Sequence, residues 1–187
     1  MQVSEIYTTA PVSGCSEIEM KTYALLDQLG IPYERVEHAP ANTMEDCQDI
    51  DQALNTKICK NLFLCNRQKT EFYLLSMPGE KPFQTKELSK QIGSARLSFA
   101  PGEMMEELLC CPPGSASILG FAYDTEHRVH CLMDREIYES EHFGCHPCLN
   151  VGSMKVAWHL CRKLLCYPCL PSGATAFFSP GTKLQQQ

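Results

Sequence analysis

The sequence lacks several features that would assign the protein to a particular class. It has no uninterrupted run of about 18 apolar residues, so no helix that crosses a membrane is expected. Residues Met1 to Glu5 lack the basic region and apolar stretch of a secretory signal. Lys and Arg number 16 against 22 Asp and Glu, and the net charge of -6 argues against general affinity for nucleic acid. We therefore expect a cytoplasmic protein with no membrane partner.

The chain is long enough for one domain with a sizeable core, and it contains no internal repeat. Its 187 residues are 44% hydrophobic and 20% charged, an ordinary balance for a globular protein. We expect an N-terminal extension at 1–15, a single domain at 16–170 and a loose C-terminal tail at 171–187.

The pattern of caps, turns and apolar spacing predicts interspersed helices and strands. Ser16 and Glu19 form a capping box at the start of a helix, and Gly93 ends another helix that begins near Thr85. Residues 58–65 and 72–77 indicate two strands joined by a polar turn.

A second hairpin is predicted from residues 118–123 and 128–133. Because several strands are expected to be joined by hairpins, the sequence favours an α+β fold with a mixed, mainly antiparallel sheet. Twelve cysteines are many for a chain without an export signal. Several, such as Cys65, Cys110 and Cys131, lie in apolar runs, so we predict that most are reduced and belong to the core.

Positive charge is concentrated between Lys57 and Arg96. This segment contains eight basic and three acidic residues, a net charge of +5 that leaves -11 for the remainder of the chain. Such a face could steer a polyanion towards one side of the molecule. The same charges could also belong to a solvated helix and hairpin, and the sequence leaves both interpretations open.

Lys60 is the most informative position, because with Asn61 it leads into the apolar run from Leu62 to Leu64. Burying an unpaired charge is costly. The side chain therefore either extends its ammonium group to solvent or is kept in place to hold an anion. The residues that follow along the chain favour the second interpretation.

Four further segments follow Lys60 in a definite order. They are Arg96 to Ala100, Pro113 to Ser117 with Gly120, Asp124, and His146-Pro147 with Asn150. In this order and at about these separations, the set resembles the prolyl-tRNA editing family, the YbaK-like deacylases related to the editing domain of bacterial prolyl-tRNA synthetase. The resemblance runs from about Met20 to about Ser153. It implies a curved, barrel-like mixed sheet flanked by helices.

The resemblance also implies a hydrolase that removes the amino acid from mischarged tRNA without a metal or cofactor. Lys60 matches the family's essential lysine, since Asn and an apolar run follow it directly. The catalytic candidates are Lys60, Gly120 and His146. The substrate-binding candidates are Asn61, Gly114, Ser115, Ser117, Ile118, Leu119 and Asn150. Taken alone, the glycine turn could be an ordinary β-turn, His146 a loop histidine and Asp124 a turn cap.

The expected chemistry is the hydrolysis of an activated ester. It needs a positioned water, donors for the developing oxyanion and a grip on the terminal nucleotide. A pocket that admits alanine and excludes proline would act as the second sieve of editing. The Gly-Ser turn and the nearby Ile118 and Leu119 would set the size of this pocket. Many relatives have Pro-Phe where this chain has Ile118-Leu119, which leaves the amino acid open: alanyl-tRNA(Pro) is favoured, with cysteine or serine as alternatives. The expected partners are the acceptor end of aminoacyl-tRNA and prolyl-tRNA synthetase.

Two Cys-x-x-Cys pairs support a different interpretation. Cys145, Cys148, Cys166 and Cys169 have the spacing of a four-cysteine zinc site, which would make the C-terminal third a zinc-stapled binding module. Against it, a cysteine-rich chain produces such pairs by chance, and the family pattern places His146 and Pro147 at an active site without metal. A third interpretation is a module that senses charged tRNA without turnover.

Overall fold

The computed structural model describes residues 1–41, 44–165 and 175–178. The helices are α1 (Glu17–Gln28), α2 (Met44–Leu54), α3 (Thr85–Ile92), α4 (Gly102–Leu109), the 3-10 helix η1 (Ile118–Ala122), α5 (Arg135–Glu139) and α6 (Trp158–Leu165). The strands are β1 (Tyr33–Glu37), β2 (Cys59–Cys65), β3 (Phe72–Pro78), β4 (Ser98–Phe99), β5 (Val129–Asp134), β6 (His142–Cys145), β7 (Gly152–Ala157) and β8 (Thr175–Phe178).

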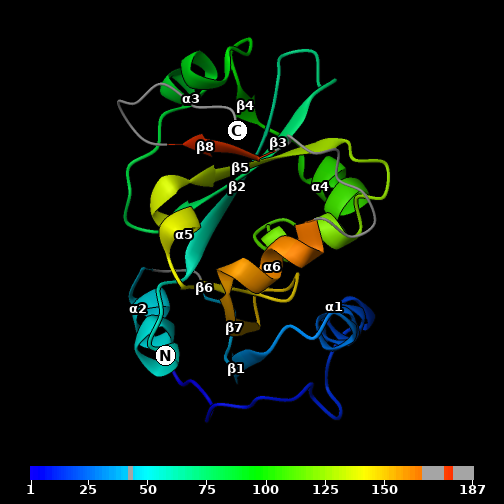
Figure 1. Cartoon of the computed structure of the whole chain (residues 1–187), viewed down its shortest axis with the longest axis vertical. Helices are drawn as coiled ribbons and strands as arrows, with labels where there is room; N and C mark the ends of the chain where they lie inside the picture. Colours follow the sequence, from blue (N-terminus) through cyan, green and yellow to red (C-terminus); the bar gives the residue numbers. More distant parts are fainter. Residues whose placement is uncertain (42–43, 166–174, 179–187) are drawn as a thin grey trace.

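The strands form two sheets, which Figure 1 shows one above the other. The smaller sheet has the order β1-β7-β6 and is antiparallel. The larger has the order β4-β2-β3-β5-β8, with antiparallel pairs around β2 and parallel pairs around β5. The predicted α+β class with mixed sheets flanked by helices is therefore confirmed. Within the described residues, however, the two sheets do not close into a barrel.

The predicted caps at the start of α1 and at the end of α3 are confirmed. The Ser16 hydroxyl accepts a hydrogen bond from the Glu19 amide at 3.3 Å, and the Glu19 carboxylate accepts one from the Ser16 amide at 2.9 Å. At the end of α3, Gly93 has a φ of 66°, a left-handed conformation that suits glycine. Caps of this kind satisfy the backbone groups that a helix leaves unpaired at its ends.

The first predicted hairpin is also confirmed. β2 and β3 pair in register from Cys59 opposite Pro78 to Cys65 opposite Phe72. In the turn between them, the Asn66 carboxamide oxygen accepts from the Thr70 amide at 2.9 Å. β3 lies in the middle of the larger sheet, and all seven of its residues are buried. This hairpin places Lys60 near the start of a central strand.

The second predicted hairpin is wrong. Residues 118–122 form the helix η1, which begins where the Ser117 hydroxyl accepts from the Leu119 amide at 3.2 Å. β5 pairs in parallel with β3 and β8 instead of with a strand at 118–123. The cause is that a short, continuously apolar run fits a buried helical turn as well as a strand, so its periodicity does not distinguish the two.

Both ends of the chain add to the sheets. The predicted N-terminal extension lies along β1, with isolated bridges from Val3 to His38 and from Tyr7 to Arg35. In the predicted loose tail, residues 175–178 form β8 beside β5, so the tail expectation needs correction at this segment. The other residues of the tail lie outside the described part of the chain. None of the helices in the described ranges is both long enough and apolar enough to cross a membrane.

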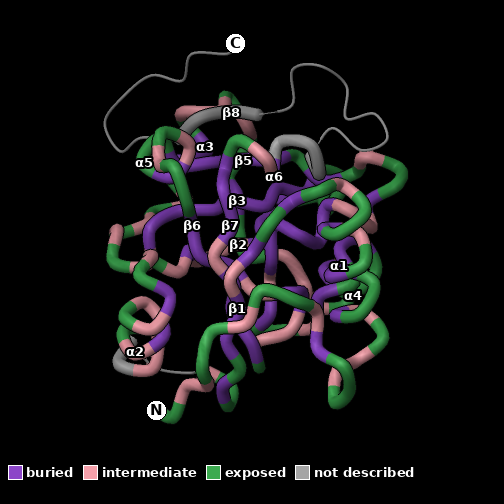
Figure 2. The backbone as a smooth tube through the Cα atoms, turned by 60° about the horizontal axis from the view of Figure 1, so that its bottom comes forward, coloured by how far each residue is buried: buried purple, intermediate pink, exposed green. Residues whose placement is uncertain are grey.

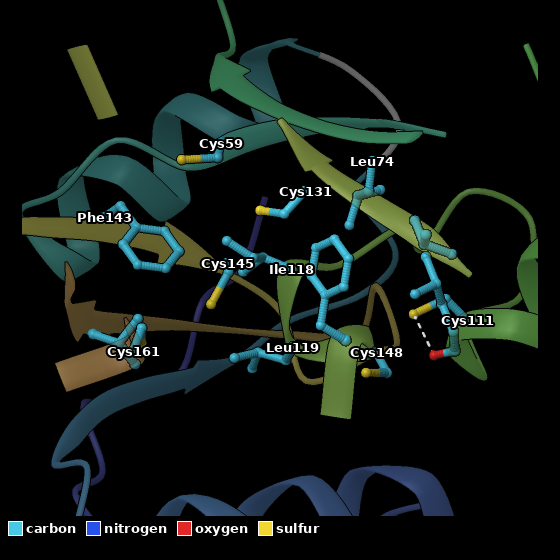
Figure 3. Packing of buried hydrophobic residues seen from close by; sticks show 14 of the residues in the cluster. Cys59, Leu74, Cys111, Ile118, Leu119, Cys131, Phe143, Cys145, Cys148 and Cys161 are labelled. Atoms are coloured by element: carbon cyan, nitrogen blue, oxygen red, sulfur yellow. Dashed lines mark hydrogen bonds between the residues drawn. The ribbon is translucent and has the colours of Figure 1, made fainter. Parts of the chain in front are cut away.

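The core follows the central strands, and Figure 2 shows β3 buried along its length and β7 buried over most of it. All ten cysteines in the described ranges are free thiols, and seven of them are buried. Figure 3 shows Cys131 and Cys145 beside Ile118 and Phe143 in the main apolar cluster. Burial raises the pKa of the Cys131 thiol to about 12, so it stays neutral. The predicted core role is therefore confirmed for most of these cysteines, but Cys110 is exposed.

Candidate functional site

A cavity of about 510 Å³ is the candidate site. Five of the predicted site residues line it: Lys60, Asn61, Gly114, His146 and Asn150. They come from three segments that lie far apart in the sequence, namely the start of β2, the turn before η1 and the β6–β7 connection. The volume is within the range of small-molecule sites in proteins, roughly 300–1,000 Å³.

Lys60 is half-buried on the cavity wall. Its Nζ donates to the carbonyl oxygen of Gly79 at 3.0 Å and also to that of Lys81. Burial lowers the pKa of the Lys60 ammonium group. An ammonium group has three N–H donors, so one remains for a ligand after these two bonds. Next to it, the Asn61 carboxamide oxygen accepts from the Ser76 hydroxyl on β3.

The glycine turn borders the cavity through Gly114. The Ser115 amide donates to the Pro112 carbonyl at 2.9 Å, and Gly114 has a φ of 84°. Proline followed by a glycine with positive φ is typical of a type II turn. A residue with a Cβ would be strained here, so the turn requires glycine at the position that faces the cavity.

Two buried serines join this turn to the β6–β7 connection. The Ser115 hydroxyl accepts from the Asn150 amide at 3.1 Å, and the Ser117 hydroxyl donates to the His146 carbonyl at 2.6 Å. Neither serine belongs to the cavity lining. Their place in the structure is behind the wall, where they position His146 and Asn150.

Ile118, Leu119 and Gly120 lie in the core and do not line the cavity. A Cβ on Gly120 would lie 2.9 Å from the Leu109 carbonyl oxygen, so this glycine is needed for close packing of η1 on the end of α4. We expected Ile118 and Leu119 to set the pocket size and Gly120 to be catalytic. Their positions away from the cavity lining do not support these roles. Because η1 is a buried helical turn, these residues can act on the site only through packing.

His146 lies on the cavity wall. Its Nδ1 is buried and, within the described residues, has no hydrogen-bond partner. Burial, and next the neighbouring His38, lower the pKa of His146 to about 4. The imidazole is therefore neutral at pH 7.

The lowered pKa of His146 predicts a pH dependence of stability. Below the ordinary value of 6.5 the unfolded chain binds a proton that the folded protein does not bind until about pH 4. The free energy of unfolding should therefore fall as the pH is lowered from 6.5 towards 4, and this contribution should be constant above 6.5.

A pKa shift from 6.5 to about 4 corresponds to about 3 kcal/mol in the free energy of unfolding. Since His146 as a whole is half-buried beside the cavity, we expect a smaller loss of about 1–2 kcal/mol. Urea unfolding of the wild type and of His146→Gln at several pH values measures it. The difference between the two proteins should shrink below pH 6.5, and parallel pH profiles would contradict the prediction.

Several cavity residues were not singled out as site candidates by the sequence. Asp51 at the end of α2 and Phe99 on β4 both line the cavity, and Phe99 is 63% exposed. Phe99 lies in one of the segments on which the family resemblance rests. No feature of the sequence around Asp51 identifies it as a site residue. Asp124 accepts from the amides of Arg128 and Val129 at 3.0 and 2.8 Å, which confirms it as a turn cap.

The proposed zinc ligands are only partly described. Cys145 and Cys148 are buried, and Thr22 donates to the Cys148 sulfur at 3.8 Å. Burial raises the pKa of the Cys145 thiol well above its ordinary value. Cys166 and Cys169 lie outside the described residues.

Comparisons with known proteins point to editing of aminoacyl-tRNA. The profile of the aminoacyl-tRNA editing domain family matches residues 38–164. Prolyl-tRNA editing protein ProX of Acetoanaerobium sticklandii is 29% identical over 142 residues, which are 76% of this chain and 87% of the relative. Prolyl-tRNA synthetase associated domain-containing protein 1 of Danio rerio is 30% identical over 149 residues, which are 79% and 78% of the two chains.

The fold has similar solved structures. One, described as a candidate trans-editing enzyme for prolyl tRNA synthetase, superposes with a TM-score of 0.64 at 15% identity. The match covers 93% of this chain and 100% of the other. At this identity the likeness supports the arrangement of the sheets and helices.

Proposed function

Because the chain belongs to the aminoacyl-tRNA editing domain family, as its sequence predicted, we propose that it is an aminoacyl-tRNA deacylase. The proposed substrate is alanyl-tRNA(Pro), bound by its acceptor end, and prolyl-tRNA synthetase is the proposed second partner. The observation that carries the proposal is the meeting of Lys60, the Gly114 turn and His146 on the wall of one cavity.

The third N–H donor of Lys60 is suited to the substrate's negative charge. Two donors are already fixed by the carbonyl groups of Gly79 and Lys81, so the ammonium group is held in place before the substrate arrives. A positioned cation of this kind stabilises a phosphate or the charge that develops on the ester oxygen. The half-buried position strengthens that interaction, because water screens it less.

His146 and the glycine turn complete the chemistry. A neutral His146 on the cavity wall can line the pocket and help to position the substrate. At Gly114 the missing side chain allows the substrate to approach the backbone closely. The small side chain of Ala116 on the same wall, rather than Ile118 and Leu119, would then contribute to the choice of amino acid.

The proposal is tested by single-turnover deacylation of tRNA(Pro) charged with alanine, cysteine, serine or proline. We expect alanine to be released fastest and prolyl-tRNA(Pro) to decay at the rate seen in buffer. Release of cysteine or serine ahead of alanine would leave the enzyme class intact and replace the substrate. If none of the four esters were hydrolysed faster than in buffer, a binding module without turnover would replace the deacylase.

A further inference from the structure

Asp51 is a carboxylate on the cavity wall that the proposed chemistry does not use. It lies in the last turn of α2, and its Oδ1 accepts a hydrogen bond from the Ile58 amide at 2.7 Å. This bond closes the connection from α2 to β2 and fixes the carboxylate beside Ile58, the residue directly before the strand that carries Lys60. The cavity therefore has a fixed anion near the entry to β2 and a fixed cation on the strand itself.

Among the described residues, this carboxylate has no ion-pair partner. The charge of Lys57 acts on Asp51, but its ammonium group pairs with Glu80 at 3.3 Å. Burial raises the pKa of Asp51, while the bond to Ile58 and the charge of Lys57 act in the opposite direction. A partly buried carboxylate is costly unless a cation or several donors meet it, so the site favours a positively charged ligand group.

We propose that Asp51 binds the α-ammonium group of the aminoacyl ester and so selects amino acids over other acyl groups. This inference rests on the proposed function, since it assigns one end of the same substrate. The α-amino group of an amino acid is largely protonated slightly below neutral pH. A carboxylate with one oxygen fixed by a backbone amide can accept from that group with its other oxygen.

The test compares two esters that differ only in this group. Alanyl-tRNA(Pro) and lactyl-tRNA(Pro), in which a hydroxyl replaces the amine, are deacylated at pH 6.5 by the wild type and by Asp51→Asn. Asparagine keeps an oxygen that can accept from the Ile58 amide, so the α2–β2 connection should survive. We expect the variant to hydrolyse alanyl-tRNA at least roughly tenfold more slowly at subsaturating enzyme, with lactyl-tRNA changed far less.

Glu80→Gln is the matched control. It removes one negative charge from the same cavity wall, but from an exposed carboxylate that already has a cation partner in Lys57. The preference for alanyl- over lactyl-tRNA should change far less in this variant than in Asp51→Asn. An equal loss on both esters in Asp51→Asn would indicate a structural role for Asp51, and it would overturn the inference, as would a loss on neither.

A binding measurement separates this inference from the proposed function. Adenosine carrying alanine or lactate through a stable 3′-amide cannot be hydrolysed, so its affinity can be measured by calorimetry in the absence of turnover. We expect the alanyl compound to bind more tightly to the wild type and to lose that advantage in Asp51→Asn. If the wild type hydrolysed no ester, the proposed function would fail, and this measurement alone would decide the role of Asp51.

Discussion

Replacing Lys60 with alanine should lower the single-turnover rate of alanyl-tRNA(Pro) deacylation by about 10²–10³-fold. The ammonium group is the cation that the structure fixes on the cavity wall, through the carbonyl groups of Gly79 and Lys81. Its removal should leave the fold in place, because the side chain is only half-buried and no carboxylate in the described ranges forms an ion pair with it. Rapid quenching at saturating enzyme measures the chemical step.

Lys57→Ala is the matched control for this prediction. Lys57 also lines the cavity, but its side chain is 63% exposed and its ammonium group is paired with Glu80. We expect less than about a threefold change, as for an exposed ion pair. If both variants lost the same activity, the general positive charge of the segment would explain the result and the particular role of Lys60 would be lost.

The fold could be predicted where the signal is local. The capping box at Ser16, the left-handed Gly93 and the β2–β3 hairpin each depend on residues within a few positions of one another. The parallel pairing of β5 with β3 and of β8 with β5 depends on distant segments, and no nearby residue specifies it. The run at 118–122 was misassigned for the same reason, since its burial and not its pattern decides its conformation.

The sequence likewise predicted some features of the candidate site and not others. Lys60, Gly114, His146 and Asn150 were found because their order along the chain resembles a family, and all four line one cavity. The sequence did not reveal which neighbours support the wall and which form it. Ser115 and Ser117 belong to the sequence motif, but they lie behind the cavity wall. That distinction requires side-chain directions, which a motif does not contain.

The hydrogen bonds that hold Lys60 depend on the segment after β3, and that segment is anchored by a buried ion pair. The Lys81 ammonium group lies 2.7 Å from Oδ1 of Asp134, whose side chain is 0% exposed. The same oxygen accepts from the Glu136 amide at 3.0 Å, which caps α5, while Oδ2 has no partner within the described residues. The Lys81 ammonium group is therefore the main partner that offsets the buried negative charge of Asp134.

Lys81→Met should lower the free energy of unfolding by about 3–5 kcal/mol, because it leaves the Asp134 carboxylate buried without a cation. Urea unfolding measures the loss. Arg135→Ala is the control, since its pair with Glu139 is exposed at 3.6 Å and should be worth under about 1 kcal/mol.

The double variant Lys81→Met with Asp134→Asn should recover much of that stability, because no buried charge is then left unpaired. The backbone carbonyl of residue 81, which accepts from Lys60, is present in every one of these proteins. Deacylation should therefore return together with stability if the ion pair acts on Lys60 only by holding the segment after β3. Recovered stability without recovered deacylation would show that the Lys81 side chain itself takes part in the reaction.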